Sequence, residues 1–114
     1  MMAYDENMLD KPSVIDEDGR CAVCGRYGAT NKHHVILKGM GGRSKETERR
    51  IPLFLLCGHG NVSGCHGKFH KGILHARWRD GWEIKETEQP TKRIEALMDP
   101  DGWKPLWGWS NESR

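Results

Sequence analysis

The chain has 114 residues, of which 36% are hydrophobic and 30% are charged, and its formal net charge is +2 at pH 7. A chain of this length forms one domain with a small core. It contains no apolar run long enough to cross a membrane and no basic and apolar leader, which predicts a cytoplasmic protein with no membrane partner.

The first 18 residues are mostly acidic and show little hydrophobic periodicity. This composition predicts a loosely ordered N-terminal arm that docks locally through apolar residues such as Met8 and Val14. Residues 19–114 are then expected to form a single domain.

The next elements alternate tight turns with apolar runs. A Cys-x2-Cys turn leads to "HHVIL", whose apolar and β-branched residues predict a short strand. A glycine-containing loop follows, and then "IPLFLLC" predicts a second, buried strand. After a turn rich in Gly, Asn and Ser, "CHGKFHKGIL" has the spacing of a short helix, which places His66 and His70 on one helix face.

In the remaining third of the chain, the sequence predicts a hairpin and a short helix. The segment "ILHARWRDGWEIKE" is typical of a β-hairpin that turns at Asp80-Gly81, and "TKRIEALMD" predicts a short helix. The tail contains Trp103, Trp107 and Trp109 among prolines and glycines. It is too irregular to predict regular structure, but it is apolar enough to pack on the domain.

The four cysteines are interpreted as metal ligands because disulfides are rare in a reducing compartment. Cys21 and Cys24 form one zinc knuckle, and Cys57 and Cys65, at wider spacing, supply the second half of a tetrahedral site. His59 could replace one cysteine to give a site of three cysteines and one histidine. Four reduced cysteines packed in the core are the plainer alternative, but these cysteines flank glycine turns, as structural zinc ligands do.

Four of the six histidines, His33, His34, His66 and His70, have no structural assignment after the cysteines are assigned to zinc. His33 and His34 are adjacent on the first predicted strand and therefore point to opposite faces, so one can bind an ion while the other faces a reacting water. With His66 and His70 on the predicted helix, this arrangement gives a three-histidine metal site beside a free imidazole. Such a site is suited to hydrolysis.

The pattern "CAVCG…HHVILKGMGG…IPLFLLCGHGNVSGCHGKFH" resembles the HNH endonuclease family, in particular its small phage and bacterial members. The resemblance covers a core of residues 21–75. It implies a ββα-metal fold clamped by a four-cysteine structural zinc, in a phage or prophage setting. The expected fold class is therefore α+β, a small zinc-stabilised ββα-metal (HNH) domain with an added β-hairpin and a short C-terminal helix.

Residue by residue, the resemblance implies that His34 is the general base that deprotonates water. It implies that His33, His66 and His70 bind a catalytic divalent metal, for which Zn²⁺, Ni²⁺, Mn²⁺ and Mg²⁺ are candidates. The family's middle Asn or His falls near Pro52 here, and proline offers no side-chain hydrogen bond. Asn61, in the long turn, is the candidate orienting residue in its place.

Basic residues indicate the expected partner, DNA, because Lys and Arg neutralise the phosphate backbone. The predicted DNA contacts are Lys38, Arg43, Lys45, Lys68 and Lys71. The plainer interpretation of these side chains is a solvated polar surface.

The leading hypothesis is a metal-dependent DNA endonuclease that nicks or cuts double strands. A catalytically inactive zinc-binding adaptor for nucleic acid or protein is the alternative, and it should tolerate the loss of His34. A redox role for the Cys-x2-Cys turn fits poorly, because the chain lacks the βαβ context of thioredoxin-like motifs.

Overall fold

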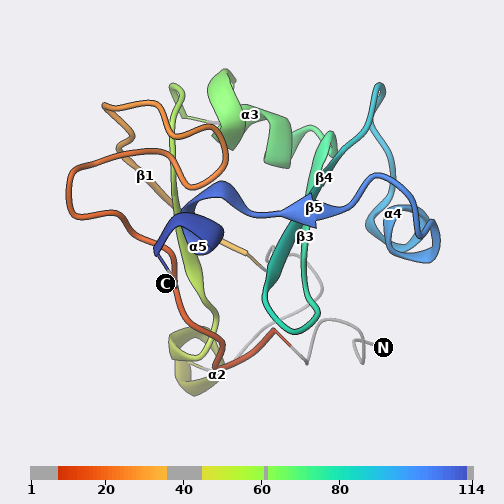
Figure 1. Cartoon of the computed structure of the whole chain (residues 1–114), viewed down its shortest axis with the longest axis horizontal. Helices are drawn as coiled ribbons and strands as arrows, with labels where there is room; N and C mark the ends of the chain where they lie inside the picture. Colours follow the sequence, from red (N-terminus) through yellow and green to blue (C-terminus); the bar gives the residue numbers. More distant parts are fainter. Residues whose placement is uncertain (1–7, 36–44, 61, 113–114) are drawn as a thin grey trace.

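The computed structural model describes residues 8–35, 45–60 and 62–112, which form an α+β fold with two small antiparallel sheets and short helices (Figure 1). None of the helices in these ranges has the length and apolar character needed to span a bilayer. In chain order the elements are β1 (Asn31–His34), α2 (Lys45–Arg49), β2 (Leu53–Leu56), α3 (Gly64–His70), β3 (Leu74–Trp78), β4 (Trp82–Glu86), α4 (Arg93–Met98), β5 (Lys104–Pro105) and α5 (Trp107–Glu112).

The first sheet pairs β1 with β2, and α3 follows β2 after a short turn. The strands are antiparallel, with His33 opposite Phe54 and His34 opposite Leu53. Helix α3 contacts both β2 and β3, so it bridges the two sheets (Figure 1). The two strands and the helix predicted from the sequence are all present, although β1 ends at His34, and Ile36 and Leu37 lie outside the described residues.

The second sheet has the strand order β3-β4-β5. The predicted hairpin is confirmed, because β3 pairs with β4 in an antiparallel register that closes at Trp78 and Trp82. Its turn requires positive φ angles, 59° at Asp80 and 144° at Gly81, and Asp and Gly are residues that tolerate them. Strand β5 pairs with β4 at the edge of the sheet, where the missing N–H of Pro105 is tolerated.

The tryptophan-rich tail forms more regular structure than the sequence predicted. It contributes β5 and the helix α5. The Trp109 ring packs on Trp78 with centroids 5.5 Å apart, and the Gly108 N–H donates to the Ala22 carbonyl at 2.8 Å. Tertiary packing therefore stabilises a helix whose own sequence has low helix propensity.

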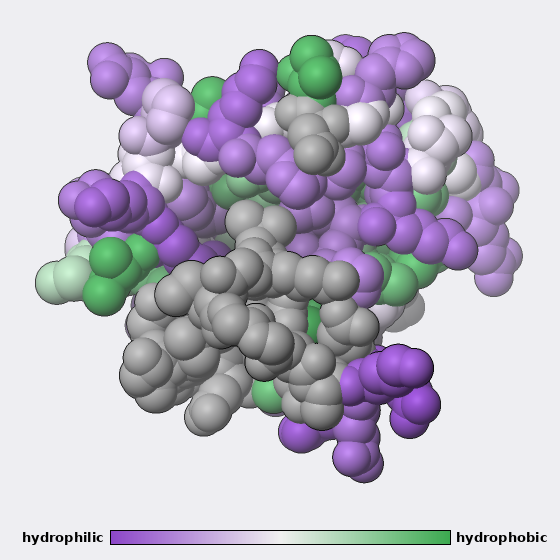
Figure 2. Space-filling model, turned by 180° about the vertical axis from the view of Figure 1, so that it is seen from behind, coloured by the Kyte–Doolittle hydropathy of each residue, from purple (hydrophilic) through white to green (hydrophobic). Residues whose placement is uncertain are grey.

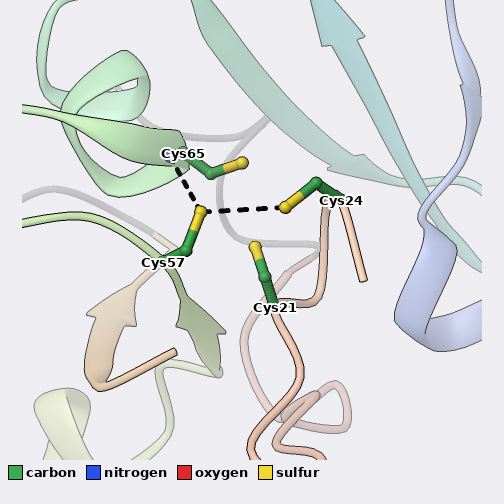
Figure 3. Close-up of side chains that lie close together, drawn as sticks. All are labelled: Cys21, Cys24, Cys57 and Cys65. Carbon is green, nitrogen blue, oxygen red and sulfur yellow. Dashed lines mark hydrogen bonds between the residues drawn. The ribbon is translucent and has the colours of Figure 1, made fainter. Parts of the chain in front are cut away.

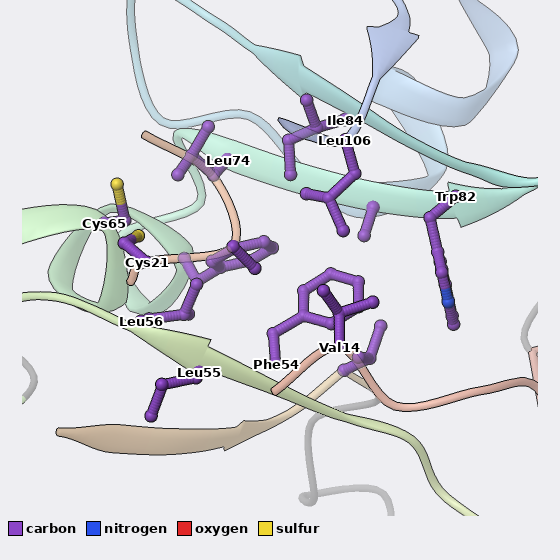
Figure 4. Packing of buried hydrophobic residues seen from close by; sticks show 14 of the residues in the cluster. Val14, Cys21, Phe54, Leu55, Leu56, Cys65, Leu74, Trp82, Ile84 and Leu106 are labelled. Atoms are coloured by element: carbon purple, nitrogen blue, oxygen red, sulfur yellow. The ribbon is translucent and has the colours of Figure 1, made fainter. Parts of the chain in front are cut away.

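The core lies between the two sheets and extends to the cysteines (Figure 4). Phe54 of β2 and Trp82 of β4 meet edge to face, with ring centroids 5.0 Å apart, and both are almost fully buried. The Trp82 indole N–H donates to the Pro12 carbonyl at 2.8 Å, so its buried polar group is satisfied. Cys21 and Cys65 belong to the same cluster of buried residues, which makes the cysteine site continuous with the core.

Within residues 8–18, the apolar side chains of Met8 and Val14 dock on the domain, as the sequence predicted for the N-terminal arm. Met8 is 0% exposed and Val14 is 2% exposed. Val14 pairs with β2 in parallel, since its N–H donates to Leu53 O at 2.9 Å and its carbonyl accepts from Leu55 N at 3.0 Å. Strand β2 thus has a backbone partner on both edges, a contact between distant segments that local periodicity does not predict.

Lys85 is a buried lysine that holds the end of α4. Lys85 is 6% exposed, and its ammonium donates to the carbonyls of Asp99 at 3.3 Å and Ala96 at 3.5 Å. It also lies 2.9 Å from the Asp99 carboxylate. These contacts satisfy carbonyls that the last helical turn leaves without backbone partners.

Replacing this lysine should destabilise the fold. We expect Lys85→Met to lower the free energy of unfolding by about 1–3 kcal/mol, because the α4 carbonyls lose their charged donor. Urea denaturation measures the change. Lys104→Met, at an exposed position that pairs with Ile84 of the neighbouring strand, is the matched control and should leave stability close to wild type. Equal stability of both variants would contradict this role of Lys85.

Candidate metal centres

Four cysteines from three parts of the chain converge in one cluster, the cysteine centre (Figure 3). Cys21 and Cys24 come from the knuckle, Cys57 directly follows β2, and Cys65 lies in the first turn of α3. All four sulfur atoms lie within 4.8 Å of one another, and those of Cys24 and Cys57 are 3.7 Å apart. Four Zn–S bonds of about 2.3 Å in a tetrahedron separate sulfurs by about 3.8 Å, so the arrangement fits zinc.

Backbone N–H groups point at these sulfurs, as is usual around bound thiolates. Val23 N donates to Cys21 Sγ at 3.4 Å, and Cys65 N donates to Cys57 Sγ at 3.5 Å. His59 is exposed and lies outside the cluster, and its backbone N–H donates to Ser63 Oγ. The geometry therefore supports a site of four cysteines rather than one of three cysteines and a histidine.

The thiols of the cysteine centre influence one another's ionisation. The hydrogen bond from the Cys65 thiol lowers the pKa of Cys21 to about 4. The same bond, followed by burial and the charge on Cys21, raises the pKa of Cys65, and burial raises the pKa of Cys24. Because each thiolate opposes ionisation of its neighbours, four thiolates can coexist only around positive charge.

The turn between Cys57 and Cys65 is closed so tightly that two of its positions exclude any side chain. A Cβ on Gly58 would lie 1.9 Å from Ser63 O, and one on Gly64 would lie 2.5 Å from Gly58 Cα. Both glycines also have positive φ angles, 119° and 68°. This close approach brings Cys57 and Cys65 into the same cluster.

Gly64→Ala should therefore destabilise the protein and weaken its hold on the metal. We expect a loss of more than about 2 kcal/mol in the free energy of unfolding, since backbone must move in addition to the left-handed strain of about 1–2 kcal/mol. Gly60→Ala is the matched control, because Gly60 has a φ of 54° but open space around its Cβ position. Thermal unfolding with zinc analysis measures both, and equal losses would contradict the steric argument.

Three histidines form a second cluster, the histidine centre. His33 comes from β1, and His66 and His70 lie one turn apart on α3. Their candidate ligand atoms lie within 4.8 Å of one another, and the Nε2 atoms of His66 and His70 are 3.2 Å apart. Metal–nitrogen bonds of about 2.0–2.1 Å would separate two such nitrogens by about 3.3 Å. The spacing fits a divalent ion.

His33 is the most buried member of the histidine centre, at 3% exposed. Its Nε2 is buried and has no hydrogen-bond partner among the described residues. Burial, and then the neighbouring His66 and His70, lower the pKa of His33 to about 3, so it stays neutral at physiological pH. A neutral imidazole can donate a ring nitrogen to a metal ion, and a metal ligand would account for this buried nitrogen, since buried polar atoms seldom lack a partner otherwise.

His34 lies on the opposite face of β1 from His33. The burial along the strand alternates, with His33 buried and His34 exposed, as the pleat requires. The structure thus presents one histidine of the pair inward to α3 and the other to solvent. This is the division that the sequence predicted for a metal ligand and a free imidazole.

The predicted DNA contacts are distributed unevenly. Lys45 and Lys71 are exposed, whereas the Lys68 ammonium lies 2.8 Å from the Glu86 carboxylate in an ion pair. Lys45 begins the helix α2, in a region that the sequence predicted as loop. Lys38, Arg43 and Asn61 lie outside the described residues. The face turned away from the view of Figure 1 is mainly hydrophilic where it is coloured (Figure 2).

Sequence reasoning overlooked Asn31. Its side-chain amide donates to Gly58 O at 2.7 Å and to Leu56 O at 3.3 Å, on either side of Cys57. The one available signal was its position two residues before His33, which puts both side chains on the same face of a strand.

Comparison of the chain with protein-family models, curated proteins and solved structures gave no match.

Proposed function

We propose that this protein is a metal-dependent endonuclease of the HNH type that hydrolyses phosphodiester bonds in DNA. The observation that carries the proposal is the convergence of His33, His66 and His70 in one cluster, in which the buried Nε2 of His33 has no hydrogen-bond partner within the described part of the chain. The solvent-exposed His34 is adjacent in the chain. An ion-binding centre with an accessible imidazole on the next residue of the strand would suit hydrolysis.

The order of the elements also supports the proposal. The antiparallel strands β1 and β2, with α2 between them in the chain, are followed by α3, and the cysteine centre lies where β2 ends and α3 begins. This is the order expected of a ββα-metal fold with a four-cysteine zinc. The added hairpin β3–β4 and the helix α4 lie C-terminal to this core.

The roles of the side chains follow from their surroundings. His33, His66 and His70 would hold the catalytic ion through ring nitrogens, and a bound divalent ion supplies positive charge that stabilises the scissile phosphate and the departing oxygen. His34 accepts the proton of the attacking water, since imidazole is the side chain that most often serves as a general base and this one faces solvent. Exposed lysines such as Lys45 and Lys71 would contact the phosphate backbone.

Conversion of supercoiled plasmid tests the proposal. The purified protein is incubated with the plasmid and with Mg²⁺, Mn²⁺, Ni²⁺, Zn²⁺ or EDTA, and binding to the same DNA is measured separately. We expect nicked or linear products with at least one ion and none with EDTA. If the protein bound DNA but left the plasmid supercoiled with every ion, it would act as a zinc-binding adaptor instead.

A further inference from the structure

The turn that connects β2 to α3 contains residues of the cysteine centre and leads directly to a residue of the histidine centre. It begins at Cys57 and ends at Cys65, two members of the cysteine centre, and the next residue is His66 of the histidine centre. The backbone closes on itself, because His66 N donates to Cys57 O at 3.0 Å. The position of the His66 ring therefore depends on the shape of this turn.

A carbonyl of the same turn fixes the proton on His66. Gly60 O lies 2.6 Å from His66 Nδ1, and since a carbonyl oxygen can only accept, Nδ1 carries the hydrogen. The other nitrogen, Nε2, is then left with a lone pair, and it faces Nε2 of His70 at 3.2 Å. Hydrogen bonds of this kind set the tautomer and ring orientation of metal-binding histidines.

Asn31 attaches the start of this turn to β1. It lies opposite Leu56 in the strand register, and its carboxamide nitrogen donates to Leu56 O at 3.3 Å and to Gly58 O at 2.7 Å. Asn31 is half-buried and alternates with the buried His33 along the strand. One strand thus carries both a member of the histidine centre and the side chain that holds the turn.

We propose that Asn31 is a positioning residue for the histidine centre, which fixes the turn so that the Gly60 carbonyl keeps His66 Nε2 directed at the ion. This role rests on the proposed function, because it requires an ion at the three histidines. Asn31 acts through the backbone of the turn and holds no ion itself.

Two measurements on the zinc-loaded protein test this role. One equivalent of zinc fills the cysteine centre, and Ni²⁺ is then titrated calorimetrically into wild type, Asn31→Ala and Asn31→Asp. Asp has the shape of Asn but no N–H to donate. We expect Ni²⁺ binding to weaken by about 10–100-fold in both variants, as for other groups that support a metal ligand. Lys32→Ala, at the adjacent exposed position of β1, is the matched control and should bind Ni²⁺ as wild type does.

The tautomer of His66 gives an independent readout before nickel is added. In a ¹⁵N–¹H correlation spectrum of the imidazoles, wild type should show the Nδ1–H form of His66, and the Asn31 variants should show a mixture of forms. Unchanged Ni²⁺ affinity and tautomer in both variants would overturn the role of Asn31. So would parallel loss of zinc and nickel, since Asn31 would then serve the cysteine centre. If wild type bound no second ion, the proposed function would fail, and the role of Asn31 with it.

Discussion

Removal of zinc from the cysteine centre is expected to unfold the protein. Cys21, Cys57 and Cys65 are part of the buried core, and they connect the knuckle, β2 and α3. Structural zinc in small domains contributes on the order of 10 kcal/mol to folding, which is comparable to the whole stability of a typical domain. Without the ion, the crowded thiolates must also take up protons. No shared ligand then holds the three segments together.

Circular dichroism during chelation measures this effect, and Cys57→Ser provides the genetic equivalent. Both should abolish the cooperative thermal transition, and zinc should restore it only in wild type. His59→Ala is the matched control, because His59 is exposed and lies outside the cysteine centre. A chelated protein that keeps its fold would contradict the structural role of zinc, and loss of zinc from His59→Ala would favour a site of three cysteines and one histidine.

His34→Ala is expected to reduce the rate of DNA cleavage by about 10²–10⁴-fold, the usual contribution of a general base. The side chain faces solvent on the opposite side of β1 from His33, so its removal should leave the core and the histidine centre intact. Stability, metal content and DNA affinity should therefore stay close to wild type. Cleavage under single-turnover conditions measures the chemical step separately from binding.

Two control variants separate the base from the metal centre. His59→Ala removes another exposed histidine and should cut DNA at the wild-type rate. His33→Ala should lose the second ion along with activity, because it removes the buried member of the histidine centre. If His34→Ala cut DNA as fast as wild type, another group would serve as the base.

Local patterns in the sequence predicted the elements that local interactions determine. The Asp80-Gly81 turn has residues that accept positive φ, and the hairpin forms there. His66 and His70 are four residues apart, and the helix brings them together as that spacing requires. The clustering of the four cysteines was predictable because a metal site takes ligands from residues that are distant along the chain.

Contacts between distant segments determine the features that the sequence did not reveal. Val14 pairs with β2 across about 40 residues, and the packing of Trp109 on Trp78 stabilises a helix of low propensity. The role of Asn31 depends on its distance from Gly58 O, which becomes visible only when β1 and β2 are placed in register. A period along the chain carries no information about such pairings.

The most direct test of the central claim is the Ni²⁺ dependence of plasmid cleavage by wild type and by His33→Ala, both with zinc in the cysteine centre. We predict that the wild-type rate rises with Ni²⁺ and saturates at the concentration that fills a second site, and that His33→Ala stays inactive while remaining folded. Equal cleavage by both proteins, or no cleavage by wild type with Ni²⁺ or with any of the other candidate ions, would contradict catalysis at the histidine centre.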